Sequence, residues 1–189
     1  MGLGSNKNLM IIFDDFLPDS TLKTALADDE WWRRHKNGVP ITWTFKNKPI
    51  KNPIEHLCDL VWTQVAGITT ILCGWEYWGH NLNAQNVTGL PFHYDTNIKE
   101  LVPVGEEERR ISNGTAEHAY KGFIYYCHTE LPEGGYLELE HKDKQIERIQ
   151  SVPNRLIIFD TSLKHRVTAV TAGVRRSIVS NAWQKDMSK

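Results

Sequence analysis

Long hydrophobic runs are missing from this sequence of 189 residues. No window is apolar over the length of a membrane-spanning helix. The short apolar run at residues 9–13 is too brief for the core of a secretory signal peptide. We therefore expect neither a transmembrane segment nor a membrane partner.

Cysteine is scarce. Cys58, Cys73 and Cys127 are odd in number and widely spaced, which argues against a disulfide framework and predicts a reducing, cytoplasmic location. Charge is balanced as well, with 22 basic and 23 acidic side chains and a net charge of −1. Because both signs are interspersed, no basic stripe indicates a nucleic-acid partner.

The length predicts a single domain over residues 1–189, built in two parts. Residues 1–68 carry patterns for two strands, at 9–13 and 40–45, and for two helices. The first helix is expected from a cap at Asp19 or Ser20 to about Lys36. The second begins at Asn52-Pro53, with the cap and first-turn proline in the preferred order, and ends before Gly67. Residues 69–185 read mainly as strands, so the fold class is mainly β with supporting helices.

The stretch 153–183 predicts three short strands separated by turns. Successive side chains of a strand point to opposite faces. In the last strand, Arg175 and Ser177 therefore share one face with Trp183, and Arg176 lies on the other. An imidazole at His165 precedes this strand, so a metal ligand and a binder of carboxylates lie close together in the chain.

Two further metal-ligand types occur upstream in the sequence Pro91-Phe92-His93-Tyr94-Asp95. His93 and Asp95 project from one face of a strand, about 6.6 Å apart along it. Two imidazoles and one carboxylate with open positions form the facial triad of non-haem Fe(II) oxygenases. An H-x-D pair alone is weak support; its conjunction with His165, Arg175 and Ser177 gives it weight.

This set of motifs resembles the Fe(II)/2-oxoglutarate-dependent dioxygenases, in particular their prolyl-4-hydroxylase-like branch. The similarity begins near Leu72 and includes Ile124-Tyr125-Tyr126, Gly134-Gly135-Tyr136-Leu137 and the segment 154–160 ahead of His165. It implies a double-stranded β-helix, that is, a cupin-like jelly roll. The N-terminal helices would support one face of it.

The resemblance also implies residue roles. His93, Asp95 and His165 would hold catalytic Fe(II), with O2 and 2-oxoglutarate as cosubstrates. Arg175, Ser177 and Tyr126 would bind the 2-oxoglutarate carboxylate, and Leu137 would pack against the cosubstrate. The expected reaction is hydroxylation of a substrate C–H bond with release of succinate and CO2.

The substrate is less defined. The resemblance suggests a peptide, with a prolyl residue as the target, or a small molecule such as an amino acid. Tyr77 and Trp183 are candidates for the substrate pocket, against the alternative of core packing. Residues 96–115 are polar and read either as a solvated loop or as a lid that orders over the site.

Two other readings compete with the dioxygenase. Three protein ligands with open positions also suit zinc, so a cupin-like zinc hydrolase or a non-catalytic ligand-binding barrel is the alternative. A purely structural β-sandwich is the second. The pair Arg175 and Ser177 favours the dioxygenase, because a zinc hydrolase does not need a buried site for a dicarboxylate.

Overall fold

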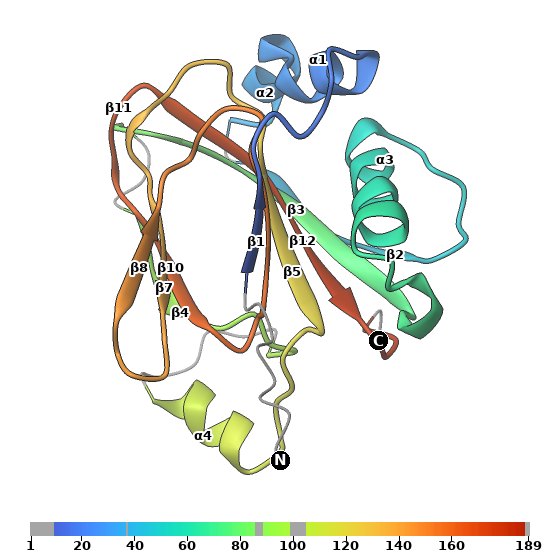
Figure 1. Cartoon of the computed structure of the whole chain (residues 1–189), viewed down its shortest axis with the longest axis vertical. Helices are drawn as coiled ribbons and strands as arrows, with labels where there is room; N and C mark the ends of the chain where they lie inside the picture. Colours follow the sequence, from blue (N-terminus) through green and yellow to red (C-terminus); the bar gives the residue numbers. More distant parts are fainter. Residues whose placement is uncertain (1–9, 37, 86–88, 99–104, 188–189) are drawn as a thin grey trace, which may run out of the picture.

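A computed structural model describes residues 10–36, 38–85, 89–98 and 105–187. Two antiparallel sheets face each other. Helices α1 (Thr21–Ala27) and α2 (Asp29–Arg34) lie at one end, and α3 (Pro53–Asp59) lies against the outer face of the larger sheet (Figure 1). Helix α4 (Glu106–Ser112) lies at the opposite end, below the smaller sheet (Figure 1).

The larger sheet has six antiparallel strands, and the last strand of the chain lies near its centre. In spatial order they are β1 (Met10–Phe13), β9 (Leu156–Phe159), β5 (Lys121–Tyr126), β12 (Val174–Trp183), β3 (Gly74–Asn83) and β2 (Val39–Phe45). β12 pairs with β5 on one side and along its whole length with β3 on the other. Strands were expected from residue 69 onward, but β3 begins only at Gly74 and continues to Asn83.

The smaller sheet has four antiparallel strands in the order β4 (Gly89–His93), β10 (Lys164–Thr168), β7 (Leu137–Glu140) and β8 (Ile146–Ile149). A two-stranded ribbon of β6 (Glu133–Gly134) and β11 (Val170–Ala172) adjoins it along the chain. Except for the hairpin of β7 and β8, neighbouring strands in these two sheets are far apart in sequence. The facing antiparallel sheets confirm the predicted jelly roll.

The first expected helix is divided into α1 (Thr21–Ala27) and α2 (Asp29–Arg34). Ser20 caps α1 as one of the two predicted caps, since its side chain accepts a hydrogen bond from the Lys23 amide. Asp28 interrupts the helix because its carboxylate accepts from the Trp31 amide, 2.8 Å away, and so caps α2. The prediction of one helix to Lys36 was wrong at this position.

α3 (Pro53–Asp59) begins as predicted, with Asn52 as its cap and proline in the first turn. A π-helical turn, Leu60–Val65, extends it towards Gly67, whose φ of 62° favours glycine. The apolar faces of these helices pack with one face of the larger sheet in a single core cluster. The helices therefore support the sheet, as predicted.

A second core cluster lies between the two sheets. It joins Ile124, Tyr126 and Val179 of the larger sheet to Leu137 and Leu139 of the smaller one. Tyr125 and Ile178, one residue away from these in each strand, belong instead to the core beneath the helices. Strand alternation therefore decides which side chains enter the space between the sheets.

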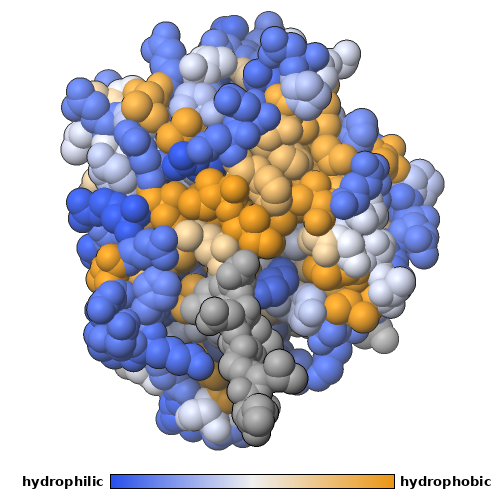
Figure 2. Space-filling view, viewed as in Figure 1, coloured by the Kyte–Doolittle hydropathy of each residue, from blue (hydrophilic) through white to orange (hydrophobic). Residues whose placement is uncertain are grey.

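All three cysteines are free, in agreement with the predicted absence of a disulfide framework. None of the helices in the described ranges has the length and apolar composition needed to cross a membrane. Figure 2 shows a hydrophobic area in the middle of the face on which β1 lies, and Ile11 and Ile12 of this edge strand are exposed.

Asn154 fixes the N-terminal strand to the body of the fold. Its backbone adopts a φ of 59°, and its buried amide exchanges hydrogen bonds with the backbone of Leu17, at 3.0 Å and 2.9 Å. The Tyr125 hydroxyl donates to the same amide oxygen at 2.9 Å. Three buried polar groups thus depend on one side chain.

We predict that Asn154→Ala lowers the free energy of unfolding by about 3 kcal/mol, because the Leu17 and Tyr125 partners remain buried without hydrogen bonds. The measurement is chemical denaturation of the two proteins. Asn47→Ala is the matched control, since Asn47 is exposed and has a similar φ of 68°. It should cost only about 1 kcal/mol, and equal losses in the two variants would contradict the prediction.

Candidate active site

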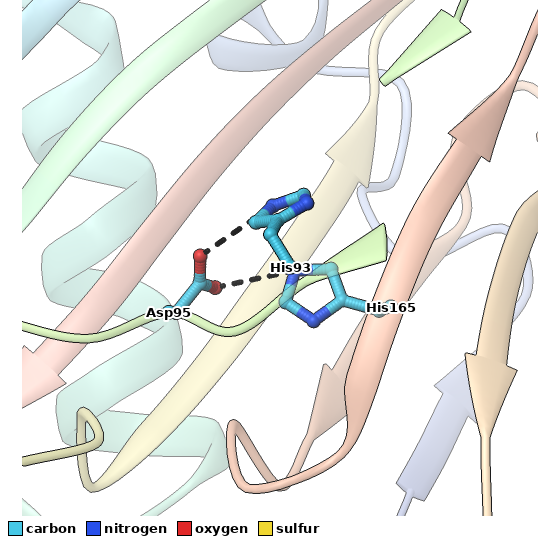
Figure 3. A group of neighbouring side chains, drawn as sticks. All are labelled: His93, Asp95 and His165. Carbon is cyan, nitrogen blue, oxygen red and sulfur yellow. Dashed lines mark ion pairs between the residues drawn. The ribbon is translucent and has the colours of Figure 1, made fainter. Parts of the chain in front are cut away.

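The His–Asp–His cluster consists of His93, Asp95 and His165, which the fold brings together from β4, the segment just after it and the neighbouring strand β10. His93 ends β4 and lies directly opposite His165 of β10. One Asp95 oxygen lies 4.0 Å from His93 Nε2, and the other lies 3.6 Å from His165 Nε2. Figure 3 shows the three side chains converging. One ligand atom from each lies within 4.8 Å of the others, close enough to hold one metal ion.

Both imidazoles are oriented by the backbone. His93 Nδ1 lies 2.8 Å from the Pro91 carbonyl oxygen, and His165 Nδ1 lies 3.0 Å from that of Leu163. Because a carbonyl oxygen only accepts, each Nδ1 carries the proton and each Nε2 presents a lone pair to the cluster. This arrangement is typical of metal-ligating histidines.

The cluster also suits a cation electrostatically. Burial lowers the pKa of His165, although the Asp95 carboxylate raises it, so the ring favours the neutral form that binds metals. Asp95 Oδ2 is buried and has no hydrogen-bond partner in the described part of the chain. A metal ion would satisfy this oxygen, and two imidazoles with one carboxylate are the donor set of non-haem Fe(II).

The arginine pocket consists of Arg175, Ser177, Tyr126 and Leu137, all of them predicted from the sequence. Arg175 is fully buried, and its Nη1 donates to Ser177 Oγ at 2.9 Å. The guanidinium lies over the ring of Tyr126 at 5.0 Å. Tyr126 and Leu137 belong to the core between the sheets. All four side chains therefore meet in the interior that also receives His165.

Several donors in this pocket lack partners. Within the described ranges, Arg175 Nε and Nη2 and the Tyr126 hydroxyl are buried without a hydrogen bond. Buried polar groups are normally satisfied, and an unpaired buried charge is costly. A carboxylate entering the pocket would accept two parallel hydrogen bonds from the guanidinium. The unsatisfied donors are therefore of the kind that a carboxylate group would satisfy.

The double glycine of the resemblance makes room for this arginine. A Cβ atom on Gly135 would lie 2.8 Å from Arg175 Cδ, and one on Gly134 would lie 2.2 Å from the Ala169 carbonyl oxygen. Both residues also have positive φ, at 64° and 74°. Glycine is therefore required at both positions for the β6–β11 ribbon to close over the pocket.

His80 lies next to the site, but it is not among the residues predicted from the sequence, because a polar stretch follows it. It lies in the middle of β3, opposite Ser177, and its Nδ1 is buried without a partner among the described residues. Burial lowers the pKa of His80 to about 4, with the charges of Arg175 and His93 acting in the same direction. A buried imidazole that favours the neutral form thus lies near both Arg175 and His93. The spacing of Trp78, His80 and Leu82, two residues apart, was the sequence signal that could have placed His80 on the inner face of a strand.

Tyr77 does not lie at the site. It pairs with Ser180 on the outer face of the larger sheet and belongs to the core beneath the helices. Its hydroxyl donates to Glu55 Oε1 of α3 at 3.2 Å. In β3, Glu76 and Trp78 pair with inward-facing residues of β12 and therefore face the interior between the sheets. Tyr77 lies between them in the strand and faces the helices, so a substrate-pocket role does not fit its placement.

Trp183 remains a candidate for substrate contact. It shares the face of β12 that carries Arg175 and Ser177, and its Nε1 donates to Glu76 Oε1 at 3.2 Å. It also lines a hollow of about 220 Å³ together with His118 and Tyr120. The neighbouring Ala119 amide donates to the Asp95 carbonyl, so this hollow adjoins the cluster.

Part of the predicted lid, residues 99–104, lies outside the described residues. The remainder is not a plain loop, because residues Glu106–Ser112 form the helix α4. Whether this segment moves over the site stays a prediction.

Comparison with known proteins agrees with this geometry. The sequence model of the 2OG-Fe(II) oxygenase superfamily matches residues 80–183, which include the cluster and the arginine pocket. The chain belongs to this superfamily. Members use Fe(II), 2-oxoglutarate and O2, and the protein is therefore a 2-oxoglutarate-dependent oxygenase. A comparison with curated protein sequences gives no significant match.

Solved structures share the fold at low sequence identity. A prolyl-4-hydroxylase of Pseudomonas putida superposes with a TM-score of 0.63 at 15% identity, covering 94% of both chains. A prolyl hydroxylase of Trichoplax adhaerens, in complex with a peptide of the hypoxia inducible factor oxygen degradation domain, gives 0.62 at 16%, covering 95% of this chain and 85% of that one. The viral collagen prolyl hydroxylase of Paramecium Bursaria Chlorella virus-1, with 2-oxoglutarate, gives 0.58 at 14%, covering 94% and 97%. These likenesses show a common fold.

We predict that Arg175→Ala weakens 2-oxoglutarate binding on the order of 100-fold, because two charge-assisted hydrogen bonds are lost. The measurement is an anaerobic titration of the Fe(II)-loaded protein with 2-oxoglutarate, followed by visible absorption. Arg176→Ala is the matched control, since the neighbouring guanidinium pairs with Asp29 on the outer side. Its affinity should stay within about threefold of the wild type, and unchanged affinity in Arg175→Ala would contradict the assignment.

Proposed function

We propose that this oxygenase is a hydroxylase, with Fe(II) held by His93, Asp95 and His165 and 2-oxoglutarate held in the arginine pocket. The observation that carries the proposal is the buried Arg175 guanidinium. Its Nε and Nη2 have no hydrogen-bond partner among the described residues, and it lies in the same interior as the His–Asp–His cluster. A dicarboxylate that reaches from one site to the other would satisfy both.

The chain's own groups have distinct tasks in this proposal. Arg175 and Ser177 hold the far carboxylate, while the Tyr126 hydroxyl supplies a further donor. Leu137 and the surrounding core exclude water from this end of the pocket. The metal and cosubstrate, when bound, supply the oxidising chemistry: O2 is consumed, 2-oxoglutarate becomes succinate and CO2, and the substrate carbon gains a hydroxyl group.

The ligand set favours hydroxylation over halogenation. Asp95 is a carboxylate that occupies a coordination position, so the halide that a halogenase needs beside its metal would have no place. The buried Oδ2 of Asp95 accepts no hydrogen bond from the described residues, which supports its role as a ligand.

Exposure indicates the side from which the substrate arrives. The side chain of His93 is 36% exposed, whereas those of Asp95 and His165 are 8% and 6% exposed. The arginine pocket lies in the closed interior. We therefore propose that the substrate approaches the metal past His93, opposite the buried cosubstrate.

We propose a peptidyl proline as the first substrate class to test, with a free amino acid as the second. The support is the full-length likeness to prolyl hydroxylases, one of which was solved with a peptide. A zinc hydrolase is less compatible with the structure, because its chemistry would leave the buried Arg175 donors unused.

The deciding experiment is the visible spectrum of the anaerobic apo-protein on addition of Fe(II) and 2-oxoglutarate. A weak charge-transfer band that requires both components is the expected result. Succinate release can then be screened with proline-containing peptides and with free amino acids. Absence of the band together with tight retention of zinc would instead support the metal-binding alternative.

We predict that Asp95→Ala abolishes the band and reduces turnover at least about 1000-fold, since the metal loses its only charged ligand. Folding should be retained, and circular dichroism checks this. Asp160→Ala is the control, because the Asp160 carboxylate pairs with Lys121 and is not one of the three proposed ligands. A band of normal intensity in Asp95→Ala would refute the ligand assignment.

A further inference from the structure

The acidic helix α4 contacts both chain segments that carry the metal ligands. Its first turn contains Glu106, Glu107 and Glu108, and each carboxylate has a different set of partners. Glu106 pairs within the helix with Arg109 and Arg110. The other two reach out of the helix towards the cluster.

Glu107 holds the backbone on both sides of Asp95. Its Oε2 accepts a hydrogen bond from the Tyr94 amide at 3.3 Å, and its Oε1 accepts from the Thr96 hydroxyl at 3.2 Å. Asp95 itself lies beyond the end of β4, where no regular sheet pairing fixes the backbone. The two oxygens of the Glu107 carboxylate thus hold this segment of backbone where sheet hydrogen bonds do not.

The opposite edge of this segment is fixed by residues that follow α4. The Ala119 amide donates to the Asp95 carbonyl at 3.1 Å, and Thr96 forms an isolated antiparallel bridge with His118. Asp95 is therefore held between α4 and the returning chain.

Glu108 makes the second connection, to β10. Its carboxylate forms an ion pair with Lys164, the residue before His165. Lys164 also lies over the Tyr94 ring, 5.4 Å from its centre, so the two ligand-bearing segments and α4 meet here. This pair is partly exposed and contributes little by itself. Glu107 is the stronger candidate for an effect on the metal.

We propose that Glu107 is a positioning residue of the metal centre, which orients Asp95 and couples the docking of α4 to metal binding. The inference rests on the proposed function, since it assumes that Asp95 ligates the metal. Groups that orient a metal ligand typically change metal affinity 10- to 100-fold when removed. Coupling is reciprocal, so the metal must in turn stabilise the docked helix.

The test compares Glu107→Ala, Glu107→Gln and the control Glu106→Ala, whose carboxylate pairs only inside the helix among the contacts described above. Metal affinity is measured with Mn(II) by electron paramagnetic resonance, without turnover. We expect Glu107→Ala to bind Mn(II) about 10-fold or more weakly, and Glu106→Ala to stay within about twofold of the wild type. Glu107→Gln keeps one acceptor oxygen and should fall between them.

A second readout separates positioning from a general loss of structure. The charge-transfer band of the anaerobic Fe(II)–2-oxoglutarate complex should shift in Glu107→Ala and keep its wild-type position in Glu106→Ala. If Glu107→Ala does not fold, hydrogen exchange of the wild type decides the matter, because residues 106–112 should become more protected on addition of Mn(II).

The outcomes are distinguishable. Wild-type affinity in Glu107→Ala, or unchanged exchange of α4 on metal binding, would overturn the proposal. Equal losses in Glu107→Gln and Glu107→Ala would show that the negative charge acts at a distance, which also overturns positioning. Failure of the wild type to bind any divalent metal would instead refute the proposed function.

Discussion

The Arg175 guanidinium lies in the interior of the jelly roll, and in the described part of the chain no acidic side chain pairs with it. Burying such a charge costs several kcal/mol unless a partner compensates it. Ser177 and the face of the Tyr126 ring compensate only part of it. The surrounding architecture keeps the Arg175 guanidinium buried and oriented, with donors available for an anion.

The two sheets divide this work. The larger sheet supplies the arginine pocket from β12 and β5, and its outer face is covered by helices that contribute no predicted site residue. The smaller sheet supplies the two imidazoles of the His–Asp–His cluster, from β4 and β10. Because these strands pair directly at His93 and His165, the separation of the two imidazoles is set by a ladder of backbone hydrogen bonds. Asp95, the third residue of the cluster, lies beyond the end of β4, and its segment is held by Glu107 of α4 on one side and by His118 and Ala119 on the other.

Strand parity is the part of the site that the sequence could predict. It correctly separated Arg175 and Ser177 from Arg176, and Tyr126 from Tyr125, since alternation is local and survives any uncertainty in strand ends. Motif resemblance added the three members of the His–Asp–His cluster. The H-x-D pair and the later histidine can be recognised in the sequence without knowing which strands are neighbours.

Long-range register is the part that it could not predict. Tyr77 and His80 lie on the same strand with opposite parity, and only the pairing of β3 with β12 shows which of them faces the interior. Helix α4 was not predicted, because its run of charged residues is equally typical of a solvated loop. Its partners Tyr94, Thr96 and Lys164 belong to other parts of the chain, so the sequence pattern does not indicate these contacts. Asp28 broke a helix through a single side-chain hydrogen bond, a competition that periodicity does not report.

The alternation of β12 has a consequence for how the protein would tolerate insertions. Adding or deleting one residue in the turn around Gly173 would shift the register of β12 by one, and every side chain of the strand would change faces. Arg176 would then enter the barrel and Arg175 would point towards the helices. The two imidazoles of the His–Asp–His cluster come from β4 and β10 of the other sheet, whose pairing does not involve β12. The proposed dicarboxylate-binding half of the site therefore depends on the length of one turn, whereas the pairing that brings the two imidazoles together does not.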